Sequence, residues 1–160
     1  MSDPAGEERR TGDEAPPEVI ARRIGEPLVA ELGDEISGIV GHGSWVHGDF
    51  CPGRSDLDLV VVLKHDPGPP LLAVAGPVLD DVTREAPVWR NRLEIGFTSR
   101  EAVEAVLAGS DGHVVGRISP GEPLHLVPAD RHRLLDWDAA HRGRAIYGPS
   151  AAEILPAIPA

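Results

Sequence analysis

Several kinds of residue are scarce in this chain of 160 residues, and each scarcity excludes a class of protein. The single cysteine, Cys51, permits no disulfide within the chain. Aromatic residues make up only 4% of the sequence, so a core must be built mainly from Val, Leu, Ile and Ala. No apolar N-terminal stretch offers a signal peptide or a membrane span. We therefore expect a cytoplasmic protein.

Positive charge is also scarce. The chain has 15 Lys and Arg against 26 Asp and Glu, which gives a formal net charge of −11. Nucleic acids and anionic membranes bind to basic surfaces, so neither is an expected partner. An acidic surface does suit a polycationic small molecule, although many soluble proteins are acidic for solubility alone. With 41% apolar residues, the length suits one domain with a real core.

The start of the chain differs in composition from the rest. Residues 1–16 are rich in Gly, Pro and charge and show no apolar period, which predicts a disordered tail. Residues 17–160 are then predicted to form one domain. Its first helix is expected over residues 20–32, where Ile and Leu recur at helical spacing, but Pro27 predicts a kink or a division into two short helices.

Two apolar runs flank a polar loop in the first half of the chain. Residues 36–40 end at a GHGS turn, and the acidic segment 55–58 (SDLD) opens a second run over residues 59–63. This pattern predicts a strand, a glycine turn and a second strand led by two carboxylates. Because side chains alternate along a strand, Asp56 and Asp58 are expected to point to the same face.

The turn and the two acids predict a joint site. Mg²⁺ prefers oxygen ligands and often binds through one or two carboxylates together with substrate phosphate. At Gly43 the absence of a Cβ lets backbone N–H groups approach an anion, and the hydroxyl of Ser44 adds a donor. These residue types in this order predict a site for a complex of a metal ion and a nucleoside triphosphate.

The second half of the chain shows weaker patterns. Residues 92–97 alternate, which predicts a strand with Glu94 on its polar face, although a merely solvent-facing acid is the alternative. A helix is expected over residues 71–85, interrupted by a Gly-Pro pair. Capping boxes at residues 98–101 and 150–153 predict the starts of two short helices. Between these helices, the sequence predicts two strands, a helix and an extended segment.

The residues Gly43-Ser44, Gly48 and 55–58 resemble the G-S…D-x-D signature of the DNA polymerase β-like nucleotidyltransferase superfamily. The sequence around them, over residues 19–156 and most clearly over 39–63, is similar to the N-terminal domain of bacterial aminoglycoside adenylyltransferases of the streptomycin/spectinomycin type. A glycine turn before a solvated strand entrance is the alternative interpretation of these residues.

This resemblance implies an α/β (α+β) nucleotidyltransferase fold, with a mixed, twisted sheet, helices mainly on one face and the site at an edge. The resemblance also implies a third carboxylate on a later strand of the sheet, and Glu94 is the residue at the matching position. The implied metal ligands and catalytic residues are Asp56, Asp58 and Glu94, and the implied nucleotide-binding residues are Gly43, Ser44, Ser55, Asp56 and Asp58.

The implied reaction moves AMP from ATP to a hydroxyl group of an aminoglycoside-type small molecule and releases pyrophosphate. Two Mg²⁺ ions would be held by the aspartates, and Glu94 would accept the hydroxyl proton or complete a metal shell. The helical substrate domain that follows in the resembling enzymes is expected to be absent. Two alternatives therefore stay open: a minimal nucleotidyltransferase antitoxin that adenylylates a helical partner protein, and a non-catalytic remnant that binds nucleotide.

The same loop contains parts of two other motifs. A dinucleotide fingerprint, G-x-G-x-x-G, needs its third glycine at position 46, whereas the chain has Gly48. The group His42, His47 and Cys51 lacks the fourth ligand that a structural zinc site normally has. Neither motif is therefore favoured.

Overall fold

The computed structural model describes residues 14–159, which form a sheet with helices on both of its faces. The strands are β1 (Ile36–His42), β2 (Leu57–Leu63), β3 (Leu93–Ser99), β4 (Val114–Ser119), β5 (Glu122–Pro128) and β6 (Arg144–Tyr147). The α-helices are α2 (Pro17–Leu32), α3 (Ser44–His47), α4 (Pro69–Glu85), α5 (Arg100–Leu107), α6 (Leu134–His141) and α7 (Ala151–Ile154). Short 3-10 turns are η1 (Gly33–Glu35), η2 (Pro87–Trp89) and η3 (Arg131–Arg133).

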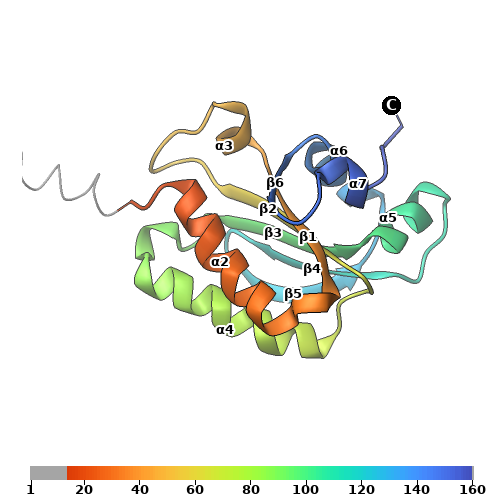
Figure 1. Cartoon of the computed structure of the whole chain (residues 1–160), viewed down its shortest axis with the longest axis horizontal. Coiled ribbons are helices and arrows are strands. Elements are labelled where there is room, and N and C mark those ends of the chain that lie inside the picture. Colours follow the sequence, from red (N-terminus) through yellow and green to blue (C-terminus); the bar gives the residue numbers. More distant parts are fainter. Residues whose placement is uncertain (1–13, 160) are drawn as a thin grey trace, which may run out of the picture.

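The sheet is mixed. Its six strands lie in the order β5-β4-β3-β2-β1-β6, so the strands with the strongest apolar patterns are central (Figure 1). Strands β2 and β3 run parallel, and every other neighbouring pair is antiparallel. The long helix α4 makes the crossover between β2 and β3 that a parallel pair needs. The predicted mixed sheet flanked by helices is confirmed.

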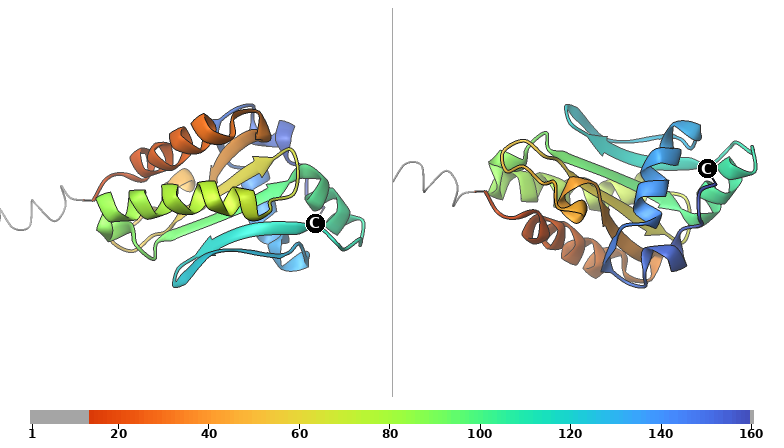
Figure 2. Two further views of the ribbon diagram at one scale, coloured as in Figure 1. Left: turned by 90° about the horizontal axis from the view of Figure 1, so that it is seen from below. Right: turned by 90° about the horizontal axis from the view of Figure 1, so that it is seen from above.

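Helices cover both faces of this sheet, which corrects the expectation that they pack mainly on one. Leu57, Leu59 and Val61 share a face with the long helices α2 and α4 in one core cluster. Val60 and Val62 point the other way, into a second cluster with the short helices α5, α6 and α7. The two views of Figure 2 show one layer each. Central strands buried on both faces explain why residues 59–63 are continuously apolar.

The prolines inside the helices interrupt neither of them, so the predicted division into two helices at Pro27 and the predicted interruption at Gly76-Pro77 are wrong. Helix α2 runs through Pro27 and α4 through Pro77. Both prolines are exposed, and the carbonyl group that each leaves without a helical partner can therefore bond to water. Burial of the opposite face, including Leu28 in α2, outweighs the local penalty.

The helix starts that were predicted from capping patterns are confirmed, although the N-cap of α5 is Ser99 and not Thr98, the first residue of the predicted box. Ser99 accepts a hydrogen bond from the backbone N–H of Ala102 at 3.0 Å and caps α5. Ser150 and Glu153 form the predicted capping box at α7. No helix among residues 14–159 combines the length and the apolar character that a bilayer span requires.

Part of the expected tail packs on the domain. Residues 1–13 lie outside the described residues. For residues 14–16 the predicted disorder is wrong, because the indole N–H of Trp89 donates to the carbonyl oxygen of Ala15 at 3.0 Å, and Glu14 forms an ion pair with Arg92 at 2.9 Å. The fold therefore begins at least three residues before α2, through contacts with residues far along the chain.

Candidate active site

Three polar side chains lie side by side across the central strands. The parallel register of β2 and β3 pairs Asp58 with Glu94, and the antiparallel register of β1 and β2 pairs Asp58 with His42. Register partners point to the same face, which here is the face covered by α6. The edge strands are β5 and β6, so the expected location at an edge of the sheet is wrong. The site lies where β2 and β3 begin and β1 ends.

Asp58 is the most perturbed acid of the site. Burial raises its pKa to about 8, helped by a side-chain hydrogen bond with Glu94 and by repulsion from Glu94, Asp56 and Asp136. A carboxyl group in these surroundings keeps its proton at neutral pH unless a cation is bound nearby. The structure thus brings Asp58 and Glu94 together, with Asp56 close enough to repel Asp58.

Gly43 packs directly against this acid pair. Its backbone has a φ of +80°, and a Cβ on this residue would overlap the Oδ2 atom of Asp58. The sequence predicted a joint site for the glycine turn and the acids, and here Gly43 and Asp58 are in contact. Only glycine satisfies both the positive φ and the lack of space.

A helix of four residues, α3, follows Gly43 where the sequence analysis expected only a polar loop. The backbone N–H groups of Val46 and His47 both donate to the carbonyl oxygen of Gly43, at 3.1 and 3.2 Å. The left-handed Gly48, with a φ of +88°, ends the helix. Ser44 is its first residue and lies next to Gly43 at the acid pair.

Trp45 holds this turn against β2. Its indole N–H donates to the carbonyl oxygen of Asp58 at 3.3 Å. The ring lies so close to β1 that a Cβ at Gly41 would overlap it, and the guanidinium group of Arg144 stacks on its face, 4.7 Å from the centroid. A buried aromatic side chain therefore fixes the distance between the turn and the acids.

His42 contributes a neutral group to the site. Burial lowers its pKa, the nearby Asp136 opposes this shift, and repulsion from His47 adds to it. The imidazole is therefore uncharged at pH 7 and does not compensate the acids.

A small cavity of about 30 Å³ lies beside Glu94, between the sheet and α6. Its polar lining includes Glu94, Arg117, Arg133 and Asp136, and Trp137 forms part of its wall. The Nε atom of Arg117 is buried and has no hydrogen-bond partner within residues 14–159. Arg117 and Asp136 were missed by sequence reasoning, because no motif or period marks a single charge on a short strand or helix.

Ser55 and Asp56 precede β2 and are both half-buried. The hydroxyl oxygen of Ser55, which the resemblance assigns to nucleotide binding, accepts a hydrogen bond from the backbone N–H of Cys51 at 2.8 Å. Its carbonyl oxygen accepts two hydrogen bonds from Arg92. Ser55 therefore shapes the loop, and Asp56 follows it at the entrance to the strand.

The donor set of the site suits a hard cation. No three His, Cys, Asp or Glu side chains in the described part of the chain are grouped so as to hold a metal ion by themselves. Asp58 and Glu94 nevertheless offer adjacent carboxylate oxygens, and Mg²⁺ commonly binds one or two carboxylates and completes its shell with phosphate and water. The residues fit Mg²⁺ that arrives with a nucleotide rather than a closed protein cage.

Comparison with known proteins identifies the fold. No protein-family model matches this chain, and no curated protein sequence matches it. Among solved structures, it is similar to spectinomycin adenyltransferase AAD(9) from Enterococcus faecialis, solved with ATP and spectinomycin, with a TM-score of 0.64 and 18% sequence identity. The match covers 88% of this chain and 60% of that enzyme, so the chain spans less than two thirds of its length. The chain thus has the nucleotidyltransferase fold that the resemblance implied.

Proposed function

We propose that this chain is a Mg²⁺-dependent nucleotidyltransferase that moves AMP from ATP to a hydroxyl group and releases pyrophosphate. The observation that carries the proposal is the pairing of Asp58 with Glu94 on neighbouring central strands, directly against the turn at Gly43. The shared fold with an adenyltransferase solved with ATP supports it. A solvated strand entrance would not need to place two half-buried acids beside each other.

Asp56 and Asp58 would hold the metal together with the triphosphate, and residues 43–44 and Ser55 would contact the nucleotide. Bound Mg²⁺, as two ions in the proposed site, would neutralise charge on the phosphates and on the attacking and leaving oxygens. The raised pKa of Asp58 fits this role, because an acid repelled by its neighbours gains most from a cation. The cost of keeping the acids together in the free protein is offset when the metal complex binds.

Glu94 would take the proton of the attacking hydroxyl or complete the metal shell. In the first role, the hydroxyl oxygen forms a bond to the α-phosphorus, the bond from that phosphorus to the bridging oxygen breaks, pyrophosphate leaves, and the proton passes to Glu94. Its place beside Asp58 is compatible with both roles.

An aminoglycoside-type small molecule is the acceptor we favour. The cavity of about 30 Å³ between the sheet and α6 adjoins Glu94 but has room for about one water molecule, so an aminoglycoside would have to bind outside it. The net charge of −11 favours a cationic ligand over an anionic one. The compared enzyme was solved with spectinomycin, which supports the same class. We propose residues 17–160 as the catalytic domain.

A helical partner protein is the second candidate acceptor. The match covers 60% of the compared enzyme and therefore does not fix the acceptor. A partner protein could supply the acceptor hydroxyl.

The test is incubation of the protein with ATP labelled at the α-phosphate, Mg²⁺ and a panel of aminoglycosides, followed by separation of labelled products. We expect a labelled aminoglycoside with the wild type and none with Asp58→Asn, whereas Asp80→Asn on the exposed side of α4 should behave as wild type. Label on a co-purified protein instead would favour the partner-protein acceptor. Tight Mg²⁺·ATP binding without any transfer would indicate a non-catalytic remnant, and no binding would contradict the proposal.

A further inference from the structure

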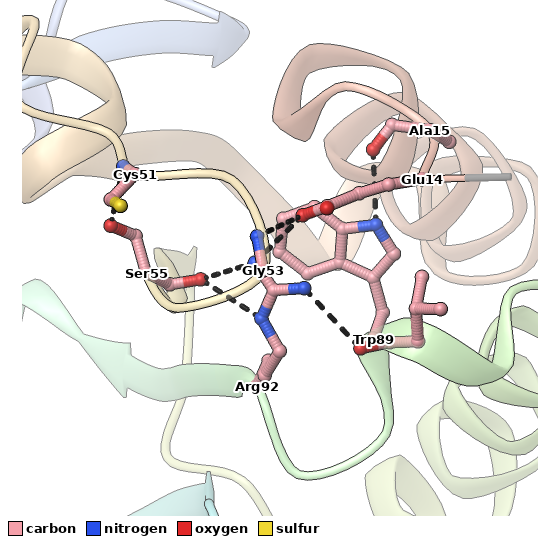
Figure 3. A network of polar contacts seen from close by, with 8 residues as sticks. Glu14, Ala15, Cys51, Gly53, Ser55, Trp89 and Arg92 are labelled. Atoms are coloured by element: carbon pink, nitrogen blue, oxygen red, sulfur yellow. Dashed lines mark hydrogen bonds and ion pairs between the residues drawn. The ribbon is translucent and has the colours of Figure 1, made fainter. Parts of the chain in front are cut away.

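Arg92 holds the main chain on both sides of Asp56. Figure 3 shows its contacts with Ser55, on the side that precedes Asp56. Its Nε and Nη2 atoms donate to the carbonyl oxygen of Ser55 at 3.1 and 2.8 Å. Its own backbone carbonyl accepts from the N–H of Leu57 at 2.8 Å. The peptide group before Asp56 and the one after it are thus both bonded to the same residue, which restricts the backbone of Asp56.

The guanidinium group that makes these contacts is itself held from several directions. It stacks on the ring of Trp89 at 4.3 Å, Nη1 donates to the carbonyl oxygen of Val88 at 3.3 Å, and Nη2 pairs with Glu14 at 2.9 Å. The side chains of Arg92 and Glu14 are only 12% and 15% exposed. A planar fork of donors buried to this extent has a defined orientation.

Glu14 extends the same network to the loop that precedes Asp56. Its Oε1 atom also accepts a hydrogen bond from the backbone N–H of Gly53 at 2.9 Å. Within the loop, the N–H of Cys51 donates to the hydroxyl oxygen of Ser55. Residues 51–55 are therefore tied at Gly53 by Glu14 and at Ser55 by Arg92.

We propose that Arg92 is a positioning residue, which sets Asp56 relative to Asp58 and Glu94 for binding of Mg²⁺·ATP. The inference rests on the proposed function of that site. Arg92 directly precedes β3, and Glu94 follows two residues later. One short segment therefore carries both Glu94 and the residue that holds the backbone at Asp56. Metal and phosphate sites lose affinity when a ligand is displaced by even a fraction of an ångström.

A purely structural role for Arg92 predicts a different result from a positioning role. Arg92→Lys retains a positive charge that can pair with Glu14, but an ammonium group cannot hold the carbonyl of Ser55 with a planar fork. If the ion pair only stabilises the domain, the lysine variant should bind nucleotide normally. If Arg92 positions Asp56, binding should weaken even though the protein stays folded.

The first experiment is calorimetric titration with Mg²⁺·ATP of the wild type, Arg92→Lys, Arg92→Ala and Arg84→Ala. Arg84 is the matched control, because it pairs with Asp81 on the exposed surface of α4. We expect about tenfold weaker binding in the lysine variant, a larger loss in the alanine variant, and a change below about twofold in the control. Thermal unfolding curves of the same variants serve as the test of whether each one is folded. Wild-type affinity in folded Arg92→Lys would overturn the proposal.

The second experiment tests the positioning of the loop without any nucleotide. Cys51 is the only cysteine and is exposed, so a nitroxide label attaches at one place within the loop. We expect a more mobile spectrum in both Arg92 variants and an unchanged one in Arg84→Ala. An unchanged spectrum in all variants would overturn the proposal.

The two experiments together separate the inference from the proposed function. A mobile loop with unchanged Mg²⁺·ATP affinity would show that Arg92 holds the loop but does not act on the site, which overturns the positioning role. If the wild type binds no Mg²⁺·ATP, that result would contradict both the proposed function and the role of Arg92 in binding this ligand. The spectra would then report only on the contact between Arg92 and the loop.

Discussion

Strand β2 has an aspartate near each end, and the two are in opposite states. Asp58 lies near its start, where its neighbours are Glu94, Asp56 and Asp136. Asp66 lies just beyond its end, where it accepts hydrogen bonds from the Ser99 hydroxyl at 2.6 Å and the Val114 N–H at 3.0 Å and contacts His113 Nδ1 at 2.8 Å. One carboxylate has its partners within the chain, and the other lies among further acids.

Their pKa values differ accordingly. Partial burial pushes the pKa of Asp66 upward, but the hydrogen bonds from Ser99, Val114 and His113 lower it by more, so the net shift is downward. Burial and neighbouring acids raise the pKa of Asp58 to about 8. The difference separates an acid that stabilises the fold from one that needs a ligand, and mutation of each can test it.

The largest expected effect comes from removing the charge at the start of β2. Asp58→Asn should lower the rate of AMP transfer by at least about 10³-fold, because an amide is a poor ligand for Mg²⁺. Single-turnover rates with labelled ATP measure it. Asp66→Asn should leave the rate of AMP transfer by the folded protein within a few-fold of wild type. Equal losses of rate in the two variants would contradict the proposal that only Asp58 acts in the site.

Replacing the partner of Asp58 should have the next largest effect. If Glu94 takes the proton, Glu94→Gln should cut the transfer rate by roughly two to four orders of magnitude and leave Mg²⁺·ATP binding near normal. If it is chiefly a metal ligand, the affinity should fall as well. Calorimetry beside single-turnover rates distinguishes the two roles. A variant with both quantities unchanged would show that Glu94 is an ordinary surface acid.

The contact between the turn and Asp58 can be tested with two glycines of positive φ. Gly43 and Gly48 have φ values of +80° and +88°, but only at Gly43 would a Cβ meet another group, the carboxylate of Asp58. Gly48→Ala should lose about 1 kcal/mol of stability, because Gly48 is left-handed with a ψ of 6°. Gly43→Ala should lose more, because its ψ of −160° lies in a region that is essentially restricted to glycine. Only Gly43→Ala should also weaken Mg²⁺·ATP binding, by roughly tenfold. Equal affinities in the two variants would argue against a phosphate-binding turn.

At the other end of β2, the expected effect is on stability. The folded-state pKa of Asp66 lies below its ordinary value of 3.8, so the stability it contributes is present above that pH and is lost as the pH falls through the folded-state pKa. Asp66→Asn should therefore unfold more easily by about 1–2 kcal/mol at pH 7, with the difference shrinking below about pH 4. Denaturant unfolding at a series of pH values measures it. A difference that is constant with pH would show that the charge of Asp66 is not involved.

The smallest expected effect is a gain of stability in Asp58→Asn. Because the pKa of Asp58 is raised from 3.8 to about 8, the folded state holds more protons than the unfolded state between these values, and the stability of the wild type falls as pH rises through that window. The variant avoids this loss. Its melting temperature, without ligand, should exceed that of the wild type by roughly 2–4 °C at pH 8 and match it near pH 4. A lower melting temperature at pH 8 would contradict the raised pKa.

Much of the local structure was predictable from the sequence. The apolar pattern of residues 59–63 predicted β2, and the patterns at Ser99 and Ser150 predicted the helix starts. The predicted placement of Asp56 and Asp58 on one face depended on alternation along one strand, but Asp56 lies before β2, which begins at Leu57. The breaks expected at Pro27 and Pro77 failed, because the cost of a proline depends on whether its side of the helix faces water, which local sequence does not reveal.

The sequence by itself determined the strands, the glycine turn and the acids of the candidate site, because periodicity, capping and backbone conformation depend on residues a few positions apart. Only the tertiary structure decided which acids meet. The parallel pairing of β2 with β3 placed Glu94 beside Asp58, and packing of the first described residues placed Glu14 on Arg92. The opposite pKa shifts of Asp58 and Asp66 have the same origin, since burial and charged neighbours come from segments that are distant in the chain.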